Sequence, residues 1–434
     1  MDKMADVLGR AGAWCGQNKY LSAIKNAFQN FMPLTIAGAI GVLWCNVLVN
    51  DQTGLGLFFK PIMALDFLNP AFQAVNFCTI SCITVGITLG IAQEIGVWNM
   101  GAERAGYIPG LVGLAAWLSV TNTSHMVDGA KEAFTGIAGN ELGATGLFTG
   151  MIIGVLSVEL FCFFEKQDAL KIKMPEQVPP GVARAFEVLV PATITLIITA
   201  CIGSACYNLT GLYLNDVIKN GIQGPLGAVG ATIPGVMIIY LVIMLFWLVG
   251  IHGNNMLSAV KEALFTPLAL ENVEAFNKGE TPKNIINMYF LQMTGEFGGS
   301  GVTIGLVIAI MIFSKREDNK AIATLSLVPG LFNINETVTF GIPMVLNPIL
   351  GIPFVFACLV TIIVGYVLTV IGFCPVACLT VPWTCPPIVF GFLACGANVM
   401  GAVTQAILIV VSTVIYVPFL ISYEKYQNKQ AAEA

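Results

Sequence analysis

The sequence has few charged residues and no run of alternating apolar positions, and these two shortages already narrow its class. Charged residues make up 10% of the 434 positions, against roughly 25% in an average soluble domain. Apolar residues account for 56% and form continuous stretches such as 228–250, which a transmembrane barrel would not show. The composition therefore predicts an all-α integral membrane protein in a lipid bilayer.

Several kinds of chemistry are also excluded by what is missing. No basic stripe with interleaved aromatic residues is present, so nucleic acid is not an expected partner. The chain has two histidines, no plausible nucleophilic triad and no nucleotide-binding loop. Cys374, Cys378 and Cys385 come nearest to a metal or redox cluster, but they lack a Cys-x-x-Cys pair, so buried reduced thiols are expected. We expect no metal and no cofactor.

Apolar runs predict about ten transmembrane helices, preceded by an amphipathic segment over residues 1–30 that is retained in the protein. If the N-terminus is cytoplasmic, most lysines and arginines fall on the inner side, which places both termini in the cytoplasm. Gly146, Gly150 and Gly154 recur on one face of a predicted span. This spacing predicts close helix packing, either within the chain or across a dimer.

Two segments in the C-terminal half are too interrupted to be simple crossings. Residues 287–300 (NMYFLQMTGEFGGS) and 326–354 are apolar at their edges and rich in glycine and polar residues at their centres. Such backbone cannot face lipid, so both segments are predicted to be re-entrant hairpins lining a cavity. A polar stretch at 208–223 predicts the boundary between an N-terminal domain of residues 1–217 and a C-terminal domain of residues 218–434.

Two ionisable residues are the strongest functional candidates. Glu336, between Asn335 and Thr337, is costly in an apolar stretch unless it is paired or faces a wet cavity. It could also cap a half-helix together with Asn333 or Asn335. His252, at a predicted membrane edge, either carries a function tuned near neutral pH or caps a helix.

Weaker signals accompany them. Glu296 lies in TGEFGGSG, whose glycines let backbone amides approach a ligand, although the motif is not a phosphate loop. Trp383 offers an aromatic face for a sugar ring, or belongs to the aromatic belt at the membrane interface.

Three stretches resemble one family: GIHGNN at 250–255, GGSGVTIGL at 298–306 and FNINETVTFGIPMVLNPILGIPF at 332–354. They are similar to the sugar-translocating IIC component of the phosphoenolpyruvate-dependent phosphotransferase system (PTS), in its lactose/cellobiose/diacetylchitobiose branch. The likeness extends over essentially the whole chain. One departure is Thr337, which follows Glu336 where the family pattern has proline, a residue that would fix φ.

The resemblance implies a homodimer in the bacterial inner membrane, with the first five spans at the dimer contact and one disaccharide held in the C-terminal half. It implies that His252 and Glu336 hydrogen-bond the sugar's 6-hydroxyl, with Glu336 as general base. The phosphoryl donor would be a phosphocysteine on a separate soluble IIB protein, itself supplied by IIA. The remaining residues expected to shape the sugar pocket are Asn333, Asn335, Trp383, Thr294, Gly295, Glu296 and Ser300.

The expected function is import of a β-linked disaccharide, of diacetylchitobiose or cellobiose type, coupled to phosphorylation of its 6-hydroxyl. Whether the chain counts as an enzyme is open, because its phosphoryl donor lies on another protein. The alternative is a proton-coupled secondary sugar transporter, with Glu336 and His252 as the proton relay. A membrane enzyme without transport is a third hypothesis.

Overall fold

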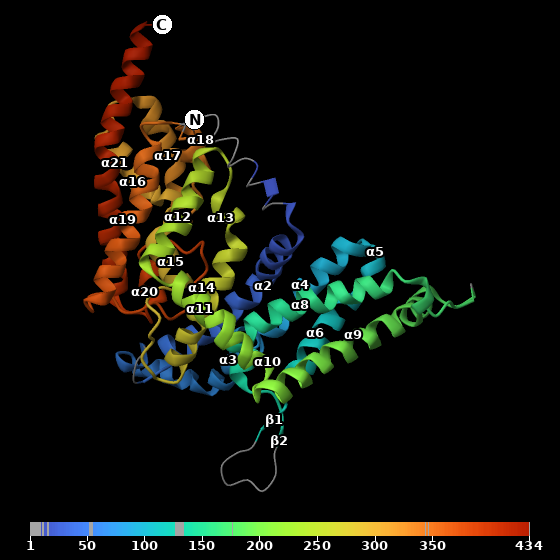
Figure 1. Cartoon of the computed structure of the whole chain (residues 1–434). Coiled ribbons are helices and arrows are strands. Elements are labelled where there is room, and N and C mark those ends of the chain that lie inside the picture. The colour runs from blue at the N-terminus through green and yellow to red at the C-terminus, as the bar shows by residue number, and fades with distance from the viewer. Residues whose placement is uncertain are drawn as a thin grey trace. The chain divides into compact units, whose positions relative to one another are not determined.

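Helices dominate the computed structural model, which describes residues 10, 13–14, 17–51, 55–125, 134–175, 177–342, 344–345 and 347–433 (Figure 1). The rest of the predicted amphipathic segment before residue 17 lies outside the described residues. The chain forms two compact units. The N-terminal unit comprises residues 17–38 and 74–227, and the C-terminal unit comprises residues 1–16, 39–73 and 228–434. The predicted domain boundary after residue 217 stays a prediction.

Long apolar helices confirm the membrane class. Five helices in the described part of the chain are long and apolar enough to cross a bilayer, and two further pairs qualify as bent spans. Shorter apolar helices cover Ile108–Val120 and Ile233–Leu248. The count of ten crossings remains a prediction. The five long spans are Lys19–Leu48, Ala144–Glu165, Pro180–Thr210, Gly351–Val370 and Val399–Gln430.

The N-terminal unit is built from apolar helices packed through small residues. Helices α4 (Ile83–Met100), α6 (Ile108–Val120) and α8 (Ala144–Glu165) contact one another, and α9 (Pro180–Thr210) packs on α6 and α8. A Cβ on Gly150 would lie 2.2 Å from Thr88 Oγ1, and a Cβ on Gly113 would lie 2.3 Å from Ala92 Cβ. Packing within the chain therefore uses the glycine face predicted for α8.

The N-terminal unit also contains a long first helix and several short elements. Two-residue strands β1 (Ser124–His125) and β2 (Phe134–Thr135) pair antiparallel. The remaining elements of this unit, and those that run into the C-terminal unit, are α2 (Lys19–Leu43), α3 (Asn69–Asn76), η4 (Phe77–Ser81), α5 (Ala102–Ala105), α7 (Gly139–Leu142), η5 (Asp168–Leu170), α10 (Leu214–Ile218), η6 (Lys219–Gln223) and α11 (Gly224–Gly230).

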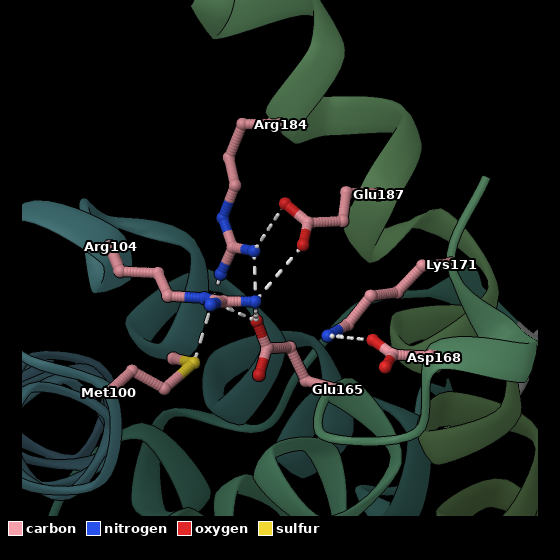
Figure 2. Close-up of polar contacts among 7 residues, drawn as sticks. All are labelled: Met100, Arg104, Glu165, Asp168, Lys171, Arg184 and Glu187. Atoms are coloured by element: carbon pink, nitrogen blue, oxygen red, sulfur yellow. Dashed lines mark hydrogen bonds and ion pairs between the residues drawn. The ribbon is translucent and has the colours of Figure 1, made fainter. Parts of the chain in front are cut away.

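Charged side chains gather where α5, α8 and α9 meet (Figure 2). Arg104 and Arg184 both contact Oε1 of Glu165 at 2.9 Å, and both also contact Glu187. Glu165 is 2% exposed. A carboxylate this deeply buried needs paired charges, and two guanidinium groups supply them. Two acids and two bases form a neutral cluster, which ties three helices together.

The C-terminal unit carries the predicted hairpins. Its helices α16, α19 and α21 run side by side (Figure 1), with α20 also on α21. The elements in chain order are η1 (Trp44–Leu48), η2 (Leu55–Leu57), η3 (Lys60–Leu68), α12 (Ile233–Leu248), α13 (Gly253–Met256), α14 (Ser258–Asn277), α15 (Met288–Gly295), η7 (Ser300–Val302), α16 (Ile304–Phe313), α17 (Glu317–Leu331), α18 (Glu336–Gly341), α19 (Gly351–Val370), α20 (Val389–Ala394) and α21 (Val399–Glu433).

Both predicted hairpin segments are interrupted helices. In the first, α15 with η7 meets α16 at a bend of 58°. Three glycines there have positive φ, 68° at Gly298, 88° at Gly299 and 75° at Gly301, a backbone that residues with a side chain rarely adopt. In the second, α17 ends at Leu331 and α18 begins at Glu336, with Asn333 at φ 63° between them. Glu296 and Ser300 lie at the first break, and Asn333 and Asn335 lie at the second.

Candidate functional site

His252 and Glu336 come together in the C-terminal unit. His252 caps α13, where its Nδ1 accepts a hydrogen bond from the main-chain N–H of Asn255 at 3.3 Å. Glu336 is the first residue of α18. The His252 Nε2 lies 3.9 Å from Glu336 Oε1, and the two side chains are 38% and 48% exposed. The capping and functional readings of His252 are therefore compatible, because the cap uses one ring nitrogen and leaves the other facing Glu336.

Close backbone packing holds His252. The Trp247 ring, buried at the end of α12, lies 4.4 Å from the imidazole between centroids. A Cβ on Gly253 would lie 2.0 Å from the carbonyl oxygen of Ile243. Only glycine allows α13 to approach α12 this closely, so His252 is fixed by the short helix that follows it.

The two predicted asparagines are held by main-chain partners. Asn335, 4% exposed, donates from Nδ2 to the carbonyl of Ser300 at 2.8 Å. Asn333 Oδ1 accepts the N–H of Gly298 at 2.6 Å, and its Nδ2 donates to the carbonyls of Trp383 and Cys385. Both side chains thus join the segment that leads into Glu336 to other parts of the unit.

Trp383 is 45% exposed and lies in the irregular segment between α19 and α20. Its carbonyl, bonded to Asn333, connects this segment to the one that carries Glu336. An indole that is half exposed beside these residues can offer a face to a ring.

The predicted residues of the first hairpin are mostly buried. Thr294 is fully buried, and its hydroxyl donates to Phe290 within α15 at 2.8 Å. A Cβ on Gly295 would lie 2.8 Å from Ile362 Cδ1. Ser300, 5% exposed, accepts at Oγ from Asn254 Nδ2 at 3.0 Å. Of these three residues, Ser300 is joined through Asn254 to the segment that carries His252.

Glu296 belongs to a buried polar network. Its Oε1 accepts from Tyr240 Oη at 2.7 Å and forms an ion pair with Lys261. Lys261 also donates to Asn254 Oδ1 at 3.2 Å. Reasoning from the sequence left Lys261, Tyr240 and Asn254 without a role. The available signal was Lys261 itself, since an ionisable residue within an apolar span calls for a partner.

No group of three His, Cys, Asp or Glu residues placed to hold a metal occurs in the described ranges. All eleven described cysteines are free. The thiols of Cys374 and Cys395 lie 3.9 Å apart. Cys374 and Cys378 are buried and Cys385 is half-buried.

The site thus contains the imidazole of His252, the carboxylate of Glu336 and the indole of Trp383. Hydrogen bonds of neighbouring polar residues hold the segments that carry them. A half-exposed acid and histidine at a break between apolar helices are typical of a helical membrane transport protein.

Comparison with known proteins identifies the family. Residues 25–358 match the family model described as "Phosphotransferase system, EIIC". The chain belongs to this family and is a membrane permease of the PTS.

Several relatives match along nearly their full length. The oligo-beta-mannoside-specific EIIC component of Bacillus subtilis is 33% identical, covering 98% of this chain and 94% of that protein. The cellobiose-specific EIIC component of Lactococcus lactis is 29% identical, covering 98% of both chains. The crystal structure of ChbC, the IIC component from the N,N'-diacetylchitobiose-specific phosphotransferase system, superposes with a TM-score of 0.88 at 29% identity, covering 97% of each chain. The resemblance found in the sequence is confirmed.

Proposed function

We propose that the chain imports a β-linked disaccharide, of diacetylchitobiose or cellobiose type, and presents its 6-hydroxyl for phosphorylation. The sugar class is supported by the relatives, whose names include cellobiose, oligo-beta-mannoside and N,N'-diacetylchitobiose. The residues proposed to act on the hydroxyl are His252 and Glu336, with Trp383 beside the rings.

The observation that carries the proposal is the 3.9 Å between His252 Nε2 and Glu336 Oε1. This separation is too long for a direct hydrogen bond, but an oxygen placed between the two atoms can lie about 2.8 Å from each. In the neutral ring, Nδ1 accepts from Asn255, so the proton is on Nε2 and can be donated to that oxygen. A sugar hydroxyl at this point would donate its own proton to Glu336.

The proposed step is a phosphoryl transfer from a cysteine of a soluble IIB protein. The sugar oxygen attacks phosphorus, the S–P bond breaks, the electron pair stays on the IIB thiolate, and the hydroxyl proton passes to Glu336. Transfer of this kind depends on in-line alignment and on removal of the proton as the new bond forms. IIA would then phosphorylate IIB again. None of the twelve cysteines of this chain is assigned the phosphoryl group.

The protein is proposed to act as a homodimer in the bacterial inner membrane, with both termini in the cytoplasm. The IIB partner would then reach the site from the cytoplasmic side. The excess of basic residues in the predicted inner segments supports this orientation.

Membrane vesicles containing the full chain test the function. Labelled cellobiose or diacetylchitobiose should accumulate as sugar phosphate only when phosphoenolpyruvate and the soluble PTS proteins are present. Uptake of unmodified sugar driven by a pH gradient alone would instead support the proton-coupled alternative, which the family match does not favour.

Two substitutions test the site within the same assay. Glu336→Gln and His252→Ala should each abolish phosphorylation, since one removes the base and the other the donor. Glu280→Gln, at an exposed loop position, and His125→Ala are the matched controls and should keep activity. Normal turnover in either site variant would reject its assigned role.

A further inference from the structure

We propose that Lys261, Asn254 and Ser300 form a polar bridge that sets the separation of His252 and Glu336, and that the buried Lys261 acts as a positioning residue without touching the sugar. The inference rests on the proposed function, because it concerns how the pair meets the 6-hydroxyl.

Ser300 is the centre of this bridge, because its two oxygens serve two different segments. Its hydroxyl accepts from Asn254, two residues after His252, at 3.0 Å. Its carbonyl accepts from Asn335, the residue before Glu336, at 2.8 Å. His252 and Glu336 are thus each a short, fixed stretch of backbone away from the same serine.

Lys261 determines which way the amide of Asn254 faces. A carboxamide has an acceptor end and a donor end, and Lys261 Nζ donates to the acceptor end, Oδ1, at 3.2 Å. The donor end, Nδ2, is therefore left for Ser300. Loss of the ammonium group would remove this preference, and the amide could turn away from the serine.

The ammonium group is itself held in place. It forms an ion pair with Glu296, which also accepts from Tyr240 Oη at 2.7 Å. It lies 5.6 Å from the centroid of the Tyr240 ring, within cation–π range. Lys261 is 6% exposed. The ammonium group thus contacts Asn254, Glu296 and the Tyr240 ring, and its burial keeps it away from a sugar.

Close backbone packing beside the bridge restricts its movement. A Cβ on Gly299 would lie 2.6 Å from Asn335 Cγ, and a Cβ on Gly253 would lie 2.0 Å from the Ile243 carbonyl. Two segments packed this closely cannot shift along one another unless they first move apart. Loss of a side-chain hydrogen bond from Asn254 or Asn335 to Ser300 is therefore expected to change the distance between His252 and Glu336.

The test compares two sugars on the purified full-length protein in detergent. The probes are cellobiose, or diacetylchitobiose if it binds more tightly, and the analogue of the same sugar that lacks the 6-hydroxyl. Isothermal titration calorimetry gives both dissociation constants. The unchanged protein should bind the parent sugar about tenfold or more tightly than the 6-deoxy analogue, since a hydrogen bond to a charged group is at stake.

Lys261→Met should remove most of this preference while the affinity for the 6-deoxy analogue stays within about twofold. Lys278→Met is the matched control, because Lys278 pairs with Glu274 at the exposed end of the same helix region, and it should keep the full preference. If Lys261→Met leaves Glu296 unpaired and fails to fold, the double variant Lys261→Met with Glu296→Gln removes both charges and is judged by the same two constants.

The possible outcomes distinguish the positioning role of Lys261 from a general structural role. A preference retained in the Lys261 variants overturns the inference. A parallel loss of affinity for both sugars also overturns it, because that result describes a general structural role. Equal binding of both sugars by the unchanged protein overturns the proposed function, and the inference with it.

Discussion

The side-chain amide of Asn333 donates to the main-chain carbonyls of Trp383 and Cys385. The same side chain accepts the N–H of Gly298 at 2.6 Å. One residue with a left-handed backbone, at φ 63°, thereby joins both hairpin segments and the segment that carries Trp383. Asparagine suits this position, since it tolerates positive φ better than most residues and has both a donor and an acceptor.

Asn333→Asp should lower thermal stability and sugar affinity together. The substitution keeps the shape but places a second acceptor against two carbonyls, and the loss of these partly exposed hydrogen bonds costs about 1 kcal/mol. The measurements are the melting temperature in detergent and sugar binding by calorimetry. Asn208→Asp, on the exposed end of α9, is the control. An Asn333 variant that melts like the control would show that these bonds contribute little.

Gly299→Ala should disrupt the first hairpin. Its φ is 88° and an added Cβ would lie 2.6 Å from Asn335 Cβ, so backbone strain and a steric clash add to about 2 kcal/mol or more. Gly279→Ala separates the two effects, because Gly279 has φ 73° but nothing within 4 Å of its Cβ position. We expect the melting temperature to fall further for Gly299 than for Gly279. Equal shifts would argue against the clash.

Arg184→Met should destabilise the N-terminal unit. The change leaves the buried Glu165 with Arg104 alone (Figure 2), and loss of one charged partner from a buried carboxylate costs on the order of 1–3 kcal/mol. Lys171→Met breaks the pair with Asp168, whose side chain is 81% exposed, and should change stability little. Limited proteolysis and thermal melting compare the two variants. If the cluster contributed no more than an exposed ion pair, the two variants would have the same melting temperature and the same proteolysis rate.

Acid should loosen the start of α17. The hydrogen bond from the Arg316 guanidinium holds the pKa of Asp318 below its ordinary value. A lowered pKa in the folded protein means that the ion pair stabilises the fold at neutral pH and that this contribution is lost as the pH falls through the folded pKa, below about 4. Hydrogen–deuterium exchange at residues 317–322, corrected for intrinsic rates, should rise over that range. Asp318→Asn should show the faster exchange at neutral pH as well, and an unchanged rate in that variant would contradict the role of the pair.

The sequence was sufficient to predict the membrane class and the positions of the two broken segments, because composition, apolar runs and glycine-rich breaks are local properties. It also brought forward His252 and Glu336, through the cost of ionisable groups at membrane depth and through a resemblance to a known family. Their roles, and those of the other predicted sugar contacts, remain proposals.

Partners from distant segments could not be predicted in this way. The pairing of Lys261 with Glu296 and the use of Ser300 by two asparagines depend on how α13, α14 and the hairpins pack, which no local pattern encodes. The same is true of α13 itself. This short helix covers Gly253–Met256 and is followed by α14 over Ser258–Asn277. Gly253, its first residue, lies against the Ile243 carbonyl of α12, a contact between separate segments.

Main-chain atoms serve as the partners of Asn333 and Asn335, and this has a consequence for engineering. Carbonyl groups persist through any substitution of the residues that own them, so Trp383 and Cys385 can change side chain without removing an acceptor of Asn333. A directed-evolution library aimed at new sugars should therefore vary the half-exposed Trp383 and its neighbours and leave both asparagines fixed. Selectivity would then be redesigned at the positions proposed to face the sugar rings, and both asparagines would stay unchanged.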